Sequence, residues 1–222
     1  MKLIRIPAAA GSLHHAEMVV NAGEDLGSAS AAVIMLHGRG ATADSIIGLS
    51  SYLPASGIAY IAPQATGNVW YPYSFLAPIE QNEPWLSAAL NRVSEIVDHT
   101  VRAGIPERKI MLLGFSQGAS LSLEWTARNA RPIGAVFGLS GGLIGPLGAL
   151  RTYPGRLDGT TAFLGCSDVD FHIPKERVRE SADVLTAMNA AVTMRLYPDM
   201  DHTVNDDEIA FVRQTVEGIA GT

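Results

Sequence analysis

The chain has 222 residues, of which 47% are hydrophobic, and its 16 basic and 22 acidic residues give a formal net charge of −6. This size and apolar content predict a single domain, residues 1–222, with a substantial core, because no Gly/Ser-rich or charged run supplies a linker. The acidic balance and the lack of a Lys/Arg cluster argue against nucleic acid or an anionic membrane surface as a partner.

The sequence also indicates a compartment. Arg5 and Pro7 interrupt the N-terminal apolar stretch, which disfavours a signal peptide. No apolar run approaches the length of a membrane span, so we expect no stable membrane insertion. Cys166 is the single cysteine and cannot form an internal disulfide. We therefore expect a cytoplasmic protein, and the sequence leaves a homodimer open.

Strand-like and helix-like segments alternate along the chain. Near-continuous apolar runs indicate strands buried on both faces, and apolar residues three and four apart indicate amphipathic helices. The expected strands are 16–21, 31–36, 58–62, 110–113, 133–139, 161–165 and 191–197, and the expected helices are 42–53, 85–101, 119–130, 175–189 and 205–219. We expect the first strand at an edge and Asn205 or Asp206 as the cap of the last helix. The alternation predicts a mostly parallel twisted sheet with helices on both faces.

An irregular segment at about residues 64–84 breaks this alternation. It is rich in aromatic residues and proline, and it is too long for an ordinary connection, which favours a binding loop. Small-ligand sites are usually apolar pockets with few polar groups, so Trp70 and Phe75 are predicted to contact substrate. The alternative is that these rings only pack in the core.

Two G-x-S-x-G pentapeptides occur, and their surroundings distinguish them. Ser116 lies between an expected strand and an expected helix, as in a nucleophile elbow, where side chains at the flanking glycine positions would clash. Ser140 also ends a strand, but the glycines and prolines after it cannot begin a regular helix. No helix N-terminus would stabilise an oxyanion there. Ser116 is therefore the candidate nucleophile.

A serine hydroxyl needs a neighbouring base, which an acid must orient. His202 follows the last strand and is the candidate base, whereas Asp168 and Asp170 both follow the strand at 161–165 and are both candidate acids. The other carboxylate is expected to bond within its own turn. A metal cluster of Asp168, Asp170 and His172 would lack a second ligand group, so no metal is expected. Loops at the carboxyl ends of parallel strands meet at one sheet edge, which would bring these residues together.

Two backbone amides are candidates to stabilise an oxyanion. Gln117 follows the nucleophile at the start of its helix, and Gly38 and Gly40 leave room for substrate beside the amide of Arg39. The Arg39 side chain needs no role in this interpretation. Cys166 is expected to be a small buried residue, since nothing near it in the sequence would lower its pKa.

Together these motifs resemble the phospholipase/carboxylesterase family of α/β-hydrolases, whose relatives include acyl-protein thioesterases. The likeness extends from the strand at 31–36 to the last helix and rests on Leu36–Gly40, Trp70–Pro72, Gly114–Gly118, Asp170–Pro174 and His202–Thr203. The resemblance implies the α/β-hydrolase fold and no metal or organic cofactor. It favours Asp170 as the acid, although Phe171 stands where proline is usual, and it assigns the second oxyanion amide to Arg39.

The sequence therefore predicts a serine carboxylesterase that hydrolyses small-molecule esters. Ser116 would attack the carbonyl, His202 would transfer the proton, Asp170 would hold the imidazole, and water would hydrolyse the acyl-enzyme. An acyl thioesterase or lysophospholipase acting on long acyl chains is the alternative within enzymes. A non-catalytic binding protein of the same fold is the alternative from another class.

Overall fold

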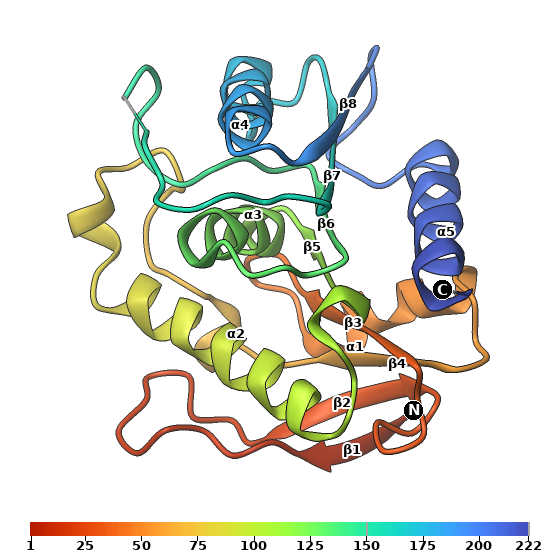
Figure 1. Cartoon of the computed structure of the whole chain (residues 1–222). Coiled ribbons are helices and arrows are strands. Elements are labelled where there is room, and N and C mark those ends of the chain that lie inside the picture. The colour runs from red at the N-terminus through yellow and green to blue at the C-terminus, as the bar shows by residue number, and fades with distance from the viewer. Residues whose placement is uncertain (150, 222) are drawn as a thin grey trace.

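A computed structural model of the protein describes residues 1–149 and 151–221, in which eight strands form one sheet (Figure 1). The strands are β1 (Lys2–Arg5), β2 (Met18–Gly23), β3 (Ala31–Leu36), β4 (Ile58–Ala62), β5 (Ile110–Phe115), β6 (Ala135–Leu139), β7 (Thr161–Ser167) and β8 (Ala191–Tyr197). Their order is β1-β2-β4-β3-β5-β6-β7-β8. β3 to β8 run parallel, whereas β2 pairs antiparallel with both of its neighbours. The predicted mostly parallel sheet is confirmed.

Helices cover both faces of this sheet. They are α1 (Ala43–Ile47), α2 (Trp85–Arg102), α3 (Gln117–Asn129), α4 (Lys175–Ala187) and α5 (Asp206–Gly221), with 3-10 turns η1 (Gly48–Tyr52), η2 (Thr66–Asn68), η3 (Ile79–Asn82) and η4 (Glu107–Lys109). α2, α3 and α4 pack on one face, and α1 and α5 pack on the other (Figure 1). β3 and β4 are buried along their whole length, as expected for parallel strands covered on both sides. None of the helices in the described residues is long and apolar enough to cross a membrane.

The N-terminal region differs from the prediction. The expected edge strand is present as β2, but it lies inside the sheet, because β1 pairs with its outer side. β1 has only one half-buried residue among exposed ones, so its apolar pattern is too weak to be recognised in the sequence. The helix expected at 42–53 is divided into α1 and η1. Of the two expected caps of α5, Asn205 takes this role, because its Oδ1 accepts from the Glu208 amide at 2.9 Å.

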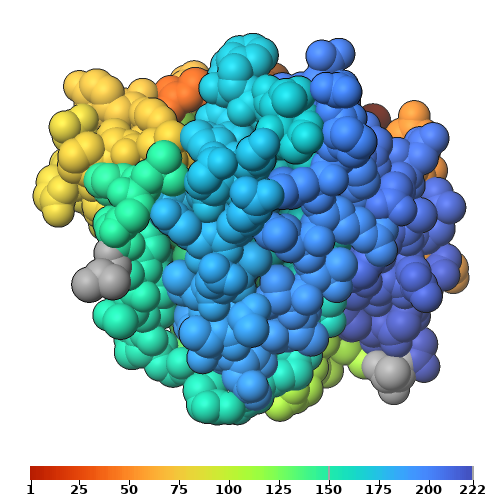
Figure 2. Space-filling model, turned by 90° about the horizontal axis from the view of Figure 1, so that it is seen from above, coloured from red at the N-terminus to blue at the C-terminus, as the bar shows by residue number. Residues whose placement is uncertain are grey.

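The loops with the candidate functional residues follow the carboxyl ends of β3, β5, β7 and β8. The irregular segment that follows β4 (gold) lies against the segment that follows β6 (green-cyan), as Figure 2 shows. The Gly145 amide donates to the Phe75 carbonyl there, at 2.6 Å. The long loop is thus packed against the sheet edge that carries the candidate site.

Candidate active site

The turn between β5 and α3 holds Ser116 in a backbone conformation that is rare for a residue with a side chain. Its φ is 55° and its ψ is −117°, a strained combination that the surrounding structure must maintain. A Cβ on Gly114 would overlap the Gly118 carbonyl, and a Cβ on Gly118 would overlap the Leu36 carbonyl. Both glycines therefore allow close packing of α3 on the sheet, as the pentapeptide leads one to expect.

The structure brings Ser116, His202 and Asp170 into one hydrogen-bonded row. Ser116 Oγ lies 3.0 Å from His202 Nε2, and His202 Nδ1 lies 2.6 Å from Asp170 Oδ2. The other oxygen of Asp170 accepts from the backbone amides of His172 at 2.8 Å and Ile173 at 3.2 Å. A proton on Nδ1 that points to the carboxylate leaves Nε2 to accept the serine proton. The row therefore has the geometry that activates a serine hydroxyl.

The competing residues have other environments. Asp168 Oδ1 accepts from the Asp199 amide at 3.1 Å, which is a bond between turns and not a contact with His202. Ser140 is fully buried. Cys166 is buried as expected, and burial raises the pKa of its thiol to about 12. Of these three, none offers an accessible nucleophile or an alternative acid.

The two candidate oxyanion amides belong to segments next to the nucleophile. A Cβ built on Gly38 would be 3.4 Å from the Cβ of Ser116, so the loop after β3 lies against the nucleophile. The Arg39 amide makes no hydrogen bond to any described residue. The Gln117 amide belongs to the first turn of α3, where N–H groups lack a partner within the helix. Both amides can therefore donate to a bound ligand.

A pocket of about 530 Å³ contains Ser116 and His202 in its lining. Phe75, predicted as a substrate contact, also lines this pocket. Trp70 does not: it is fully buried, and its indole Nε1 donates to the His37 carbonyl at 2.9 Å. The sequence pattern could not separate the two rings, because an aromatic loop residue can face either the pocket or the core. The Trp70 side chain takes the core position, where its N–H is satisfied.

The sequence did not predict two side chains, Arg39 and His14, that bond to the backbone of the aromatic loop. The Arg39 guanidinium donates to the carbonyl oxygens of Tyr71, Pro72 and Tyr73 at 2.9, 2.9 and 2.6 Å. His14 belongs to a segment without a regular pattern, yet it is fully buried and its Nε2 lies 2.9 Å from the Trp70 carbonyl. Burial lowers the pKa of His14, which favours the neutral ring. Neither contact has a local sequence signal, because each joins segments far apart in the chain.

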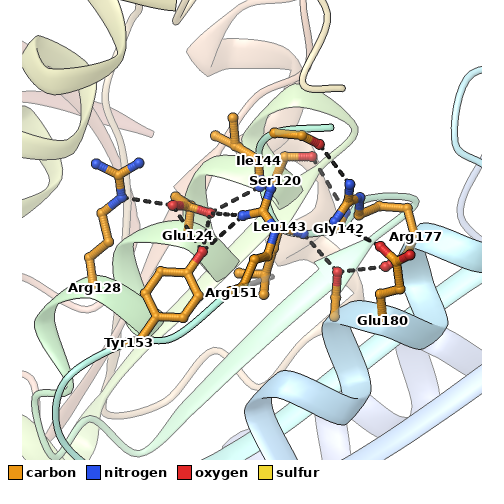
Figure 3. Close-up of polar contacts among 12 residues, drawn as sticks. Ser120, Glu124, Arg128, Gly142, Leu143, Ile144, Arg151, Tyr153, Arg177 and Glu180 are labelled. Carbon is orange, nitrogen blue, oxygen red and sulfur yellow. Dashed lines mark hydrogen bonds and ion pairs between the residues drawn. The ribbon is translucent and has the colours of Figure 1, made fainter. Parts of the chain in front are cut away.

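A polar network joins α3, α4 and the segment after β6 (Figure 3). Ser120 is a pocket-lining residue, and Glu124 lies one helical turn further along α3. The amides of Gly142, Leu143 and Ile144 donate in turn to Ser120 Oγ, Ser181 Oγ and Glu124 Oε2, at 3.4, 2.8 and 2.9 Å. Arg177 is fully buried and donates to the Gly145 carbonyl at 2.7 Å. Residues 142–145, at the end of the second pentapeptide and after it, are thus fixed to both helices.

Known proteins share this sequence and fold. The sequence model of the Phospholipase/Carboxylesterase family matches residues 15–219. The crystal structure of a phospholipase/carboxylesterase from Dyadobacter fermentans is 46% identical, with a TM-score of 0.85 over 89% of this chain and 95% of that chain. Acyl-protein thioesterase 1 of Gibberella zeae is 28% identical over 129 residues, or 54% of this chain and 53% of that protein, so the match spans about half of this curated relative.

A more distant solved structure has the same architecture. Zea mays acyl-protein thioesterase 2 is 19% identical and superposes with a TM-score of 0.72 over 91% of this chain and 99% of that chain. Together with the sheet and helices described above, these similarities confirm the predicted α/β-hydrolase fold. The chain belongs to the phospholipase/carboxylesterase family of α/β-hydrolases.

Proposed function

We propose that the protein is a serine carboxylesterase that acts on small-molecule esters. The hydrogen-bonded row of Ser116, His202 and Asp170, of which Ser116 and His202 line the pocket, is the observation that supports this most strongly. The reaction needs no metal or organic cofactor, because the chain itself supplies a nucleophile, a base and an acid.

The proposed reaction has two halves. Ser116 Oγ attacks the ester carbonyl carbon as its proton passes to His202 Nε2, and the carbonyl oxygen becomes an oxyanion that the amides of Arg39 and Gln117 stabilise. His202 then returns the proton to the leaving alcohol, which leaves an acyl-enzyme on Ser116. Water, deprotonated by His202, releases the acid. Asp170 stabilises the imidazolium in both halves, since its buried carboxylate lies 2.6 Å from Nδ1.

A second candidate function is hydrolysis of long-chain acyl thioesters. It is supported by the similarity to acyl-protein thioesterase 1 of Gibberella zeae. Against it, polar residues form part of the pocket lining, among them Ser120, whose hydroxyl accepts from the Gly142 amide at 3.4 Å. A long apolar chain gains little from contact with polar groups that are already hydrogen-bonded. We therefore expect short acyl groups to be preferred.

Hydrolysis of p-nitrophenyl esters, from acetate to palmitate, tests the proposed function. We expect higher kcat/KM for butyrate than for palmitate. Ser116→Ala should lower kcat by roughly 10⁶-fold, the effect of removing the serine of a catalytic triad. Ser140→Ala is the matched control, since it changes the serine of the other pentapeptide, and its activity should equal that of the wild type. Activity in Ser116→Ala would contradict the proposal. Preference for palmitate would favour the second candidate, and folded protein without any turnover would favour a binding protein.

A further inference from the structure

The backbone at residues 70–73 is held by two polar side chains from different elements. Arg39, in the loop after β3, donates to three successive carbonyls of this segment. Gln117, in the first turn of α3, donates from Nε2 to the Tyr71 carbonyl at 2.8 Å and accepts at Oε1 from the Trp70 amide at 2.9 Å. The Tyr71 oxygen thus accepts from both side chains, at 2.9 Å from Arg39 and 2.8 Å from Gln117.

Arg39 and Gln117 are also the residues whose backbone amides are proposed to receive the oxyanion. Their main chains approach Ser116 from two separate elements, and their side chains meet at one carbonyl oxygen. The Tyr71 carbonyl therefore links the two donors. A shift of either element relative to the other would lengthen or bend a hydrogen bond at that oxygen.

This link matters because oxyanion donors act only at the right distance. Each must lie about 2.7–3.1 Å from the oxyanion, and a misplacement of about 1 Å can cost on the order of 100-fold in rate. Gly38 and Gly40 flank Arg39, and Gly40 has a φ of 75°, so the loop backbone itself is conformationally permissive. The Gly40 amide donates to the Asn68 carbonyl at 2.8 Å, which anchors one side of this loop. The guanidinium anchors the intervening residue.

We infer that the side chains of Arg39 and Gln117 are positioning residues, which hold their own backbone amides at the oxyanion by sharing the Tyr71 carbonyl. The inference rests on the proposed function and adds a task for the two side chains. Arginine suits this task because its planar guanidinium presents several donors in a fixed geometry, whereas the ammonium of lysine is a compact group on a flexible stem.

Arg39→Ala tests the inference. With p-nitrophenyl butyrate we expect kcat to fall on the order of 10²-fold, the scale for loss of one oxyanion donor, while KM stays nearly constant. Affinity for a trifluoromethyl ketone, which forms a tetrahedral adduct with the serine, should fall by the same factor as kcat/KM. Added guanidinium should restore part of kcat, and sodium chloride at equal ionic strength should not. Arg39→Lys should lie between the wild type and Arg39→Ala.

Arg213→Ala is the matched control. Arg213 on α5 is exposed like Arg39, and its Nε donates to a backbone carbonyl, that of Tyr52, at 2.8 Å. It does not line the pocket, so kcat should be unchanged. In the double variant with Gln117→Met, the losses in kcat/KM should be less than multiplicative, because both side chains hold the same oxygen. Circular dichroism verifies that each variant is folded.

Two results would overturn the inference. One is unchanged kcat and analogue affinity in folded Arg39→Ala, and the other is a rise in KM alone, which would make Arg39 a residue that only shapes the pocket wall. If Ser116→Ala is inactive, neither of these results argues against the proposed function. If Ser116→Ala retains activity, the proposed function itself fails.

Discussion

Asp168 and Asp170 lie two residues apart on the same turn, yet only Asp170 contacts His202. Side-chain chemistry does not distinguish them, and the sequence alone leaves both open. The path of the turn determines which carboxylate contacts His202. The amides of His172 and Ile173 donate to Asp170 Oδ1, which directs Oδ2 to the imidazole. The resemblance to the family favours Asp170, which agrees with this geometry even though Phe171 replaces the usual proline.

Replacing each acid by its amide tests this difference at the scale of single residues. Asp170→Asn should lower kcat on the order of 10⁴-fold, because an amide no longer holds the imidazole in the required tautomer. Asp168→Asn retains an oxygen that can accept from the Asp199 amide, so kcat should change little. Steady-state kinetics on p-nitrophenyl butyrate measures both. Equal, mild losses in the two variants would argue against a triad.

At the scale of elements, the packing of α3 on the sheet decides where the nucleophile lies. Gly118 is buried, and it brings the start of α3 against the carbonyl oxygens of Leu36 and His37 at the end of β3. This contact places the first turn of α3 beside the loop that carries Arg39. The same close approach brings Ser116 next to Gly38 in that loop.

Gly118→Ala should therefore lower the free energy of unfolding by about 3 kcal/mol or more, since the new methyl group meets backbone that cannot move aside easily. Gly48→Ala is the control. Gly48 is exposed, has a φ of −55°, and no atom would lie within 4 Å of its Cβ, so stability should stay within about 0.5 kcal/mol or rise slightly. Urea unfolding measures both variants. A similar, small effect of the two substitutions would contradict this account of α3 packing.

At the scale of the whole molecule, the parallel sheet follows from the sequence, because buried strands and amphipathic helices have distinct apolar patterns. The convergence of Ser116, Asp170 and His202 follows as well, since all three come after parallel strands. The position of β1, the burial of His14 and the carbonyl contacts of Arg39 do not follow. These three features depend on contacts between segments that are far apart in the sequence, and a periodic pattern within one segment does not predict such contacts.

Ser116 is proposed to be the nucleophile of an esterase. Labelling with a fluorophosphonate, followed by peptide mass mapping, tests it most directly, because the reagent reacts with a serine that a neighbouring base activates. Ser116 lines the pocket and its Oγ lies 3.0 Å from His202 Nε2, whereas Ser140 is fully buried. We expect one label per chain, on Ser116, and none in the His202→Ala variant. A label on Ser140, or no label on the folded wild-type protein, would contradict the account.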